Sequence, residues 1–188
     1  MDVGVLAVRY AKALYEFALD NGVDSQLYEK SKDLIEIFIE NPSLSESIED
    51  PLLSMENKLQ ILYKVFAIED DSSLSKVLKS YLKLLLLNKR GNYLLSSLSY
   101  FQQVYRKRNN IGIAKITTAV EIDKQMEEKI LESASKLLDK KIELKQIIDP
   151  KIVGGFILDV DDYRVDASVV AQLNKIKRKL LDKNRRIV

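Results

Sequence analysis

The run RKRNNIGIAKITTAV, residues 106–120, separates two parts of the sequence that follow different patterns. Its first five residues are three cations and two asparagines, which interrupt a helical pattern and indicate a domain boundary or hinge. Residues 111–120 are rich in β-branched side chains, which predicts a strand. We therefore expect a helical domain over residues 1–108 and a smaller α+β domain over residues 111–188.

Apolar residues recur at every third or fourth position through the first part, which predicts successive amphipathic helices. Asn21-Gly22 and Asn41-Pro42 end the first two helices, and Asp24 and Ser54 are the expected N-caps of the second and fourth. The expected helices cover residues 6–20, 25–40, 43–49, 55–66, 74–87 and 92–105. The predicted fold is mostly α, with an N-terminal six-helix bundle followed by a small α+β C-terminal domain.

The fifth helix differs from the other five. Leu82, Leu84, Leu86 and Leu87 widen its apolar stripe to nearly the whole circumference. A helix that is apolar all round either lies at the centre of a bundle or keeps one face for a partner. Both readings stay open at this point.

The second part predicts two strands, a hairpin and two helices. Residues 141–148 form the second strand, and residues 154–166 form a hairpin with Asp161-Asp162 as its turn. A helix capped by Asp123 follows the first strand, and Ser168 caps the last helix. The apolar face of the helix after Asp123 consists of Met126, Ile130, Ala134 and Leu137.

Composition excludes several chemistries. The chain has no His and no Cys, so His-based catalysis, thiol nucleophiles, zinc–thiolate sites and disulfides are ruled out. Gly154-Gly155 precedes a strand and no P-loop lysine follows it, so we expect a close backbone approach there and not a phosphate cradle. Asp159 begins an acidic cluster without the spacing of a calcium loop. We expect no catalytic residue, no cofactor and no metal.

The longest pure apolar run is Leu84 to Leu87, so we expect no membrane span, and the N-terminus does not resemble a signal peptide. Net charge is +2, but residues 175–188 hold seven Lys or Arg against one acid. That end suits an acidic partner or nucleic acid, or it is simply a helix C-terminus with favourable cations. No aromatic residue interleaves the cluster, which weakens the nucleic-acid reading.

Three segments resemble one family. RYAKALYEFA, residues 9–18, resembles the N-terminal signature of the delta subunit of F-type ATP synthase, whose mitochondrial counterpart is the oligomycin-sensitivity-conferring protein. IDPKIVGGFILDVDDYRVDASVVAQL, residues 148–173, resembles its C-terminal signature, and Asn88-Lys89-Arg90 resembles the break after its fifth helix. The chain departs from the family at Ala167, where glycine is usual, and at the Asp161-Asp162 turn.

The resemblance implies a non-catalytic stator subunit of the peripheral stalk. It links the catalytic head to the b-subunit stalk, so that ion translocation is coupled to ATP synthesis. The first domain then binds the N-terminal helix of an alpha subunit in a groove between the first and fifth helices. The second domain binds the C-terminal end of the b subunit. The protein is expected to be monomeric when free, and peripheral on the cytoplasmic face of the cell membrane in the complex.

The resemblance also assigns residues, although plain core packing remains the alternative for each. The residues expected to bind the alpha subunit are Tyr10, Ala13, Leu14, Phe17, Leu78, Leu82 and Leu84. Those expected to face the b subunit or their own sheet are Val169, Leu173, Ile176 and Leu180. Two other functions compete with the stator. One is a nucleic-acid-binding adaptor that uses the basic C-terminal end, and the other is an enzyme with a carboxylate or lysine site.

Overall fold

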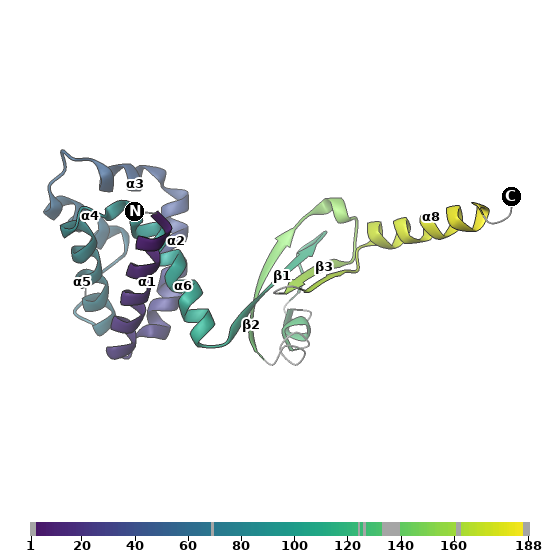
Figure 1. Ribbon diagram of the computed structural model, residues 1–188, viewed down its shortest axis with the longest axis horizontal. Helices are drawn as coiled ribbons and strands as arrows, with labels where there is room; N and C mark the ends of the chain where they lie inside the picture. The colour runs from purple at the N-terminus through teal and green to yellow at the C-terminus, as the bar shows by residue number, and fades with distance from the viewer. Residues whose placement is uncertain are drawn as a thin grey trace. The chain divides into compact units, whose positions relative to one another are not determined.

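The structure, a computed structural model, describes residues 3–68, 70–123, 125, 127–132, 140–160 and 163–185, of which Val3 and residues 179–185 are described in their backbone alone. The chain divides into two compact units, Met1–Arg108 and Asn109–Val188 (Figure 1). The first unit is helical, and the second holds a small sheet. The expectation of a mostly α chain with a C-terminal α+β part is confirmed.

The helices of unit 1 follow the apolar periodicity closely. They are α1 (Val3–Asp20), α2 (Asp24–Glu40), α3 (Pro42–Glu49), α4 (Met55–Val65), α5 (Ser73–Leu87), the short 3-10 helix η1 (Gly91–Tyr93) and α6 (Leu94–Arg108). Ser54 caps α4 as predicted, because its hydroxyl oxygen accepts a hydrogen bond from the backbone N–H of Asn57.

The predicted N-cap Asp24 is wrong. Asp24 is the first residue of α2, and Val23 before it makes no side-chain cap. The reason lies in the turn between α1 and α2: Gly22 has a φ of +65°, and Val23 is buried directly after it. Because Val23 is buried, α2 begins at the very next residue, Asp24. Asp24 therefore lies in the first turn, where its charge still suits the helix dipole.

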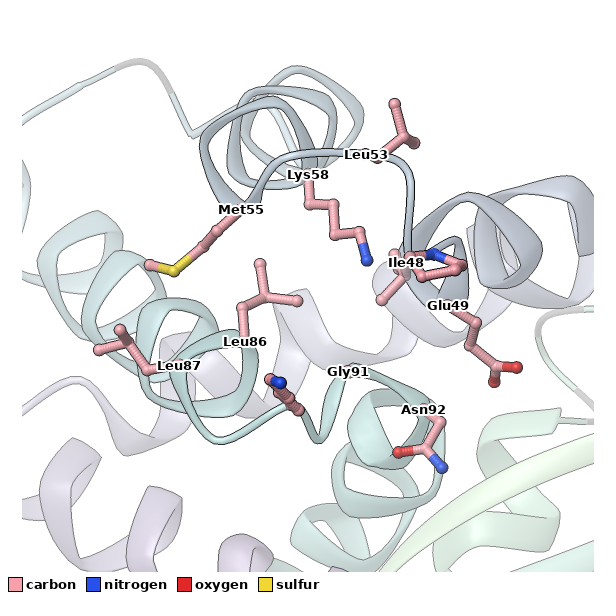
Figure 2. A pocket seen from close by; sticks show the side chains of 11 residues that line it. Ile48, Glu49, Leu53, Met55, Lys58, Leu86, Leu87, Gly91 and Asn92 are labelled. Carbon is pink, nitrogen blue, oxygen red and sulfur yellow. The ribbon is translucent and has the colours of Figure 1, made fainter.

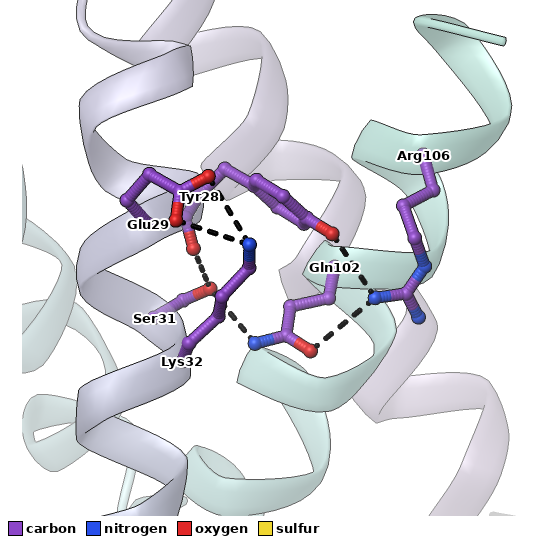
Figure 3. A network of polar contacts seen from close by, with 6 residues as sticks. All are labelled: Tyr28, Glu29, Ser31, Lys32, Gln102 and Arg106. Atoms are coloured by element: carbon purple, nitrogen blue, oxygen red, sulfur yellow. Dashed lines mark hydrogen bonds and ion pairs between the residues drawn. The ribbon is translucent and has the colours of Figure 1, made fainter. Parts of the chain in front are cut away.

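α6 forms the central support of unit 1, because it packs against both α1 and α2. Tyr105 of α6 stacks on Tyr28 of α2 with ring centroids 4.2 Å apart. Polar contacts reinforce this packing: Gln102 donates to the Ser31 hydroxyl at 3.1 Å, and Arg106 donates to the Tyr28 hydroxyl at 3.3 Å (Figure 3). α6 is thus held to α2 along its last two turns.

Unit 2 is built on a four-stranded sheet of order β2-β1-β3-β4. Its strands are β1 (Ile111–Thr118), β2 (Lys141–Ile148), β3 (Phe156–Val160) and β4 (Tyr163–Asp166). β1 runs parallel to β2, while the β1–β3 and β3–β4 pairs are antiparallel, which confirms the predicted strands and hairpin. Residues 127–132 are helical. The other predicted positions there, Met126, Ala134 and Leu137, lie outside the described residues, as does the Asp161-Asp162 turn.

The glycine pair makes a close backbone approach, as expected. Gly155 has a φ of +74°, and a Cβ atom there would lie 2.3 Å from the carbonyl oxygen of Ala167. The short 3-10 helix η2 (Pro150–Ile152) precedes this pair. Ser168 then caps α8 (Val169–Arg185), because its hydroxyl oxygen accepts from the backbone N–H of Ala171 at 3.1 Å. This packing places the start of α8 against the strand β3.

Candidate partner-binding surfaces

Of the four α1 residues predicted to bind a partner, two are exposed to solvent and two are buried. Ala13 and Phe17 face solvent, and Phe17 keeps 42% of its surface exposed. Tyr10 and Leu14 are buried, at 8% and 1% exposure. Residues 10 and 14 therefore anchor α1 in the unit, while residues 13 and 17, one turn apart, present an apolar edge to solvent.

α5 shows the same division. Leu84 is 44% exposed, whereas Leu78 and Leu82 are buried beneath it. Leu87, one turn after Leu84, is 59% exposed, although we did not predict it as a site residue. Its spacing from Leu84 was the signal that would have found it. α1 packs against α5, so the exposed apolar side chains belong to neighbouring helices (Figure 1). We call Ala13, Phe17, Leu84 and Leu87 the α1–α5 surface.

Polar contacts fix the helices that carry the α1–α5 surface. Arg90, just after α5, donates from Nη1 to the hydroxyl of Tyr10 at 3.0 Å, and its guanidinium lies 5.7 Å from the centre of the same ring. Tyr81 of α5 donates to the hydroxyl of Ser97 on α6 at 2.6 Å. Burial raises the pKa of the Tyr81 phenol above its ordinary value. The Tyr10 contact therefore joins α1 to the end of α5, and the Tyr81 contact joins α5 to α6.

Charges beside the α1–α5 surface are unevenly placed. α5 contains Lys76, Lys79 and Lys83 and no acidic residue. α1 carries the exposed cations Arg9 and Lys12 near its middle and the exposed acids Glu16 and Asp20 in its last two turns. A partner with acidic side chains would meet attraction along α5.

A second apolar stripe lies on α8. Val169, Leu173 and Ile176 recur at helical spacing and are 37%, 61% and 55% exposed. Leu173 and Ile176 face solvent, whereas Val169 is partly covered and lies close to Gly154. The side chain of Leu180, the fourth predicted residue, lies outside the described residues. Hydrogen bonds from Ser168 at the start of the helix lower the pKa of Asp166. We call residues 169, 173 and 176 the α8 stripe.

Within the described ranges, no three His, Cys, Asp or Glu side chains gather so as to hold a metal ion. Every buried polar side-chain atom in the same part of the chain has a hydrogen-bond partner. Among the helices that the structure describes, none is long and apolar enough to cross a membrane. What the structure does present is two apolar helix faces of the kind that bind other helices.

Comparison with known proteins agrees with this picture. The family model "ATP synthase delta (OSCP) subunit" matches residues 6–180. The ATP synthase subunit delta of Bacteroides thetaiotaomicron is 40% identical over 188 residues, which is all of both chains. That of Lactobacillus acidophilus is 35% identical over 180 residues, 95% of this chain and 96% of the relative.

A solved structure shares the fold. One chain of the mitochondrial ATP synthase hexamer of Toxoplasma gondii superposes with a TM-score of 0.66 at 20% identity, over 94% of this chain and 97% of that one.

The match to the family model and the identity to the Bacteroides thetaiotaomicron subunit show that the protein belongs to the ATP synthase delta (OSCP) subunit family. It is a non-catalytic stator subunit of the peripheral stalk of the F-type ATP synthase, and a peripheral component of that membrane-bound complex.

Proposed function

We propose that residues 1–108 act as a six-helix bundle that binds the N-terminal helix of an alpha subunit on the α1–α5 surface. The observation that carries this proposal is the exposure of Phe17 and Leu84 on two helices that pack together. Bundles normally bury such side chains, so an exposed apolar pair on adjacent helices suits a partner helix. The small side chain of Ala13 lets the partner backbone come close.

Residues 111–188 bind the C-terminal end of the b subunit through the α8 stripe in this proposal. The stripe is apolar, and Lys175, Lys177 and Arg178 lie beside it in the sequence of α8. An amphipathic helix of acidic character would cover the stripe and pair with these cations. The two contacts together join the catalytic head to the stalk. The subunit then sits on the cytoplasmic face of the membrane and resists the torque of the rotor, so that ion translocation is coupled to ATP synthesis.

The substitution Ala13→Asp tests the contact with the head. It places a carboxylate in an apolar interface, and burying an unpaired charge costs several kcal/mol. The affinity for a synthetic peptide that copies the N-terminus of the alpha subunit should therefore fall by about a hundredfold or more. Because Ala13 is exposed in the free protein, the melting temperature should stay within a few degrees of wild type.

Gln26→Asp is the matched control, since it adds a carboxylate at an exposed position of α2. It should leave the peptide affinity unchanged. Normal peptide binding by the Ala13→Asp variant would place the contact elsewhere, and a large loss of melting temperature would mean that Ala13 supports the core. In membranes, the same variant should release the head more readily and uncouple ATP hydrolysis from ion movement.

The stalk contact is tested by Leu173→Asp, with Asn174→Asp as its neighbour and control. Both positions are exposed on α8, and only the first belongs to the α8 stripe. Co-purification of the C-terminal segment of the stalk protein b should be lost with the first variant and kept with the second. Equal retention by both variants would remove the α8 stripe from the contact.

A further inference from the structure

A cavity of about 580 Å³ lies at the C-terminal end of α5, within unit 1 (Figure 2). Its walls come from the end of α3, the segment between α3 and α4, the start of α4 and the turn after α5. The apolar side chains that line it are Ile48, Pro51, Leu53, Met55, Leu86 and Leu87. This volume falls in the range of pockets that hold compact organic groups. A bulky side chain of a partner would fit within it.

The backbone itself forms part of the wall. A Cβ atom on Gly91 would lie 2.4 Å from Cγ2 of Ile48 and 3.1 Å from Cδ2 of Leu86. A side chain at residue 91 would therefore displace the Ile48 side chain, whereas the nearest backbone atom of α3, the Ile48 carbonyl oxygen, would lie 3.8 Å away. This close approach sets the shape of the cavity floor.

The charged residues that line the cavity are two lysines and one glutamate. Lys58 and Lys89 both line it, and Glu49 is the one acidic side chain among the lining residues. Figure 2 shows the Lys58 side chain extending from α4 toward the cavity. A largely apolar pocket with more cations than acids in its lining suits an apolar group that has a carboxylate beside it.

The cavity is continuous with the α1–α5 surface through one residue. Leu87 is 59% exposed on α5, one turn from Leu84, and it also lines the cavity. Lys83, directly before Leu84, is the nearest charged residue of α5 to this path. A segment that lies along α5 at Leu84 would therefore reach the mouth of the cavity within about one helical turn, or about 5 Å.

We propose that this cavity receives a bulky apolar side chain of the bound alpha-subunit segment, with an adjacent acidic side chain that meets Lys58. The proposal rests on the proposed function, because it takes the same partner. It adds an anchoring site beyond the helix face and states the chemistry of the residue that fills it. The partner segment thus binds at two places: along α1 and α5, and in the cavity at the C-terminal end of α5.

The variant Leu53→Trp tests the anchor by filling the cavity. Leu52→Trp is a matched control, since Leu52 is the preceding residue, is 91% exposed and does not line the cavity. Titration with the synthetic peptide from the N-terminus of the alpha subunit should show about a tenfold loss of affinity for the first variant and no loss for the second. Lys58→Glu should also weaken binding, while Lys64→Glu, exposed on the same helix, should not.

A measurement on the unaltered protein avoids any question of misfolding. The chain has three methionines, Met1, Met55 and Met126, and Met55 lines the cavity. With 13C-methyl-labelled methionine, the peptide should shift the Met55 methyl resonance, while that of Met126, in unit 2, stays in place. The Met55 resonance of the Leu53→Trp variant should respond much less to the peptide.

The outcomes separate the two proposals. If Ala13→Asp weakens peptide binding but Leu53→Trp and Lys58→Glu do not, and Met55 does not shift, the anchor is wrong and the α1–α5 contact stands. If none of the three variants weakens binding, both proposals fail. A Met55 shift that grows with protein concentration in the absence of peptide would mean that a second copy fills the cavity, and would overturn the anchor.

Discussion

Arg90 and Tyr10 are 80 residues apart in the sequence and joined by a 3.0 Å hydrogen bond in the structure. The arginine lies in the turn that leaves α5, and the tyrosine is buried in the middle of α1. The contact fixes the spacing of the two helices whose exposed sides form the α1–α5 surface. Arg90 makes two contacts with Tyr10: it donates a hydrogen bond to the hydroxyl, and its guanidinium makes a cation–π contact with the ring.

Tyr10→Phe should lower the free energy of unfolding of unit 1 by about 1 kcal/mol, because it removes the hydroxyl that accepts from Arg90. A double-mutant cycle with Arg90→Gln, followed by urea denaturation, measures the coupling between them. We expect a coupling of about 0.5–1.5 kcal/mol. Tyr163→Phe, on an exposed residue of β4, serves as control. Strict additivity of Tyr10→Phe and Arg90→Gln would show that the contact contributes nothing.

Gly155→Ala should destabilise unit 2 far more than Gly154→Ala. Gly155 has a positive φ, and an added Cβ would collide with the backbone of Ala167; the Cβ of Gly154 would meet only the Val169 side chain at 3.2 Å. We expect a loss of at least about 3 kcal/mol at residue 155 and under about 1 kcal/mol at residue 154. Hydrogen exchange of the β1 amides measures both. Similar protection in the two variants would contradict the close approach.

Trypsin should first cleave the free protein after Lys107 or Arg108. Both are exposed at the end of α6, whereas Arg106 is held by hydrogen bonds to Tyr28 and Gln102. The boundary between the two compact units follows directly after Arg108. Mass spectrometry of the first fragments identifies the cut, and Lys107→Gln with Arg108→Gln should delay it. A first cut inside α5 would show that unit 1 opens before the boundary does.

Stability should fall as the pH rises above about 10, in part because of Tyr81. Burial raises the pKa of its phenol in the folded protein, so the folded state binds the proton more tightly than the unfolded chain. This contribution is complete below the ordinary tyrosine pKa of about 10 and is lost above it. Tyr81→Phe loses the hydrogen bond to Ser97 but should show a shallower alkaline decline. Parallel curves from chemical denaturation between pH 8 and pH 11 would exclude a role for Tyr81.

Periodicity and capping residues predicted the positions of the helices and strands well. Ser54 and Ser168 each cap the helix that follows, because serine hydroxyls satisfy the free N–H groups of a first turn. Asp24 failed as a cap for a tertiary reason: the burial of Val23 decided where α2 begins. Such burial depends on neighbours that are distant in the sequence.

The site was harder to predict than the fold. The leucine-rich α5 indicated a partner face, yet Leu82 is 1% exposed and Leu84 is 44% exposed, only two positions further on. The end of α5, residues 84–87, is apolar throughout, so it offers no periodicity by which to separate its inner side from its outer side. The division follows from where α1 and α4 pack on α5. Helical periodicity could not predict the cavity either, because its lining comes from segments that are distant in the sequence, such as Ile48 and Leu53 on one side and Leu86 and Gly91 on the other.

The order of the sheet determines which strands could pair with a further strand. β2 and β4 are the outer members of the described sheet. β2 carries Lys141, Glu143 and Lys145 at alternate positions, and β4 is only four residues long and exposed throughout. Charged or short edge strands resist the addition of a further strand. Strand exchange and edge-to-edge polymerisation through β2 and β4 are therefore disfavoured.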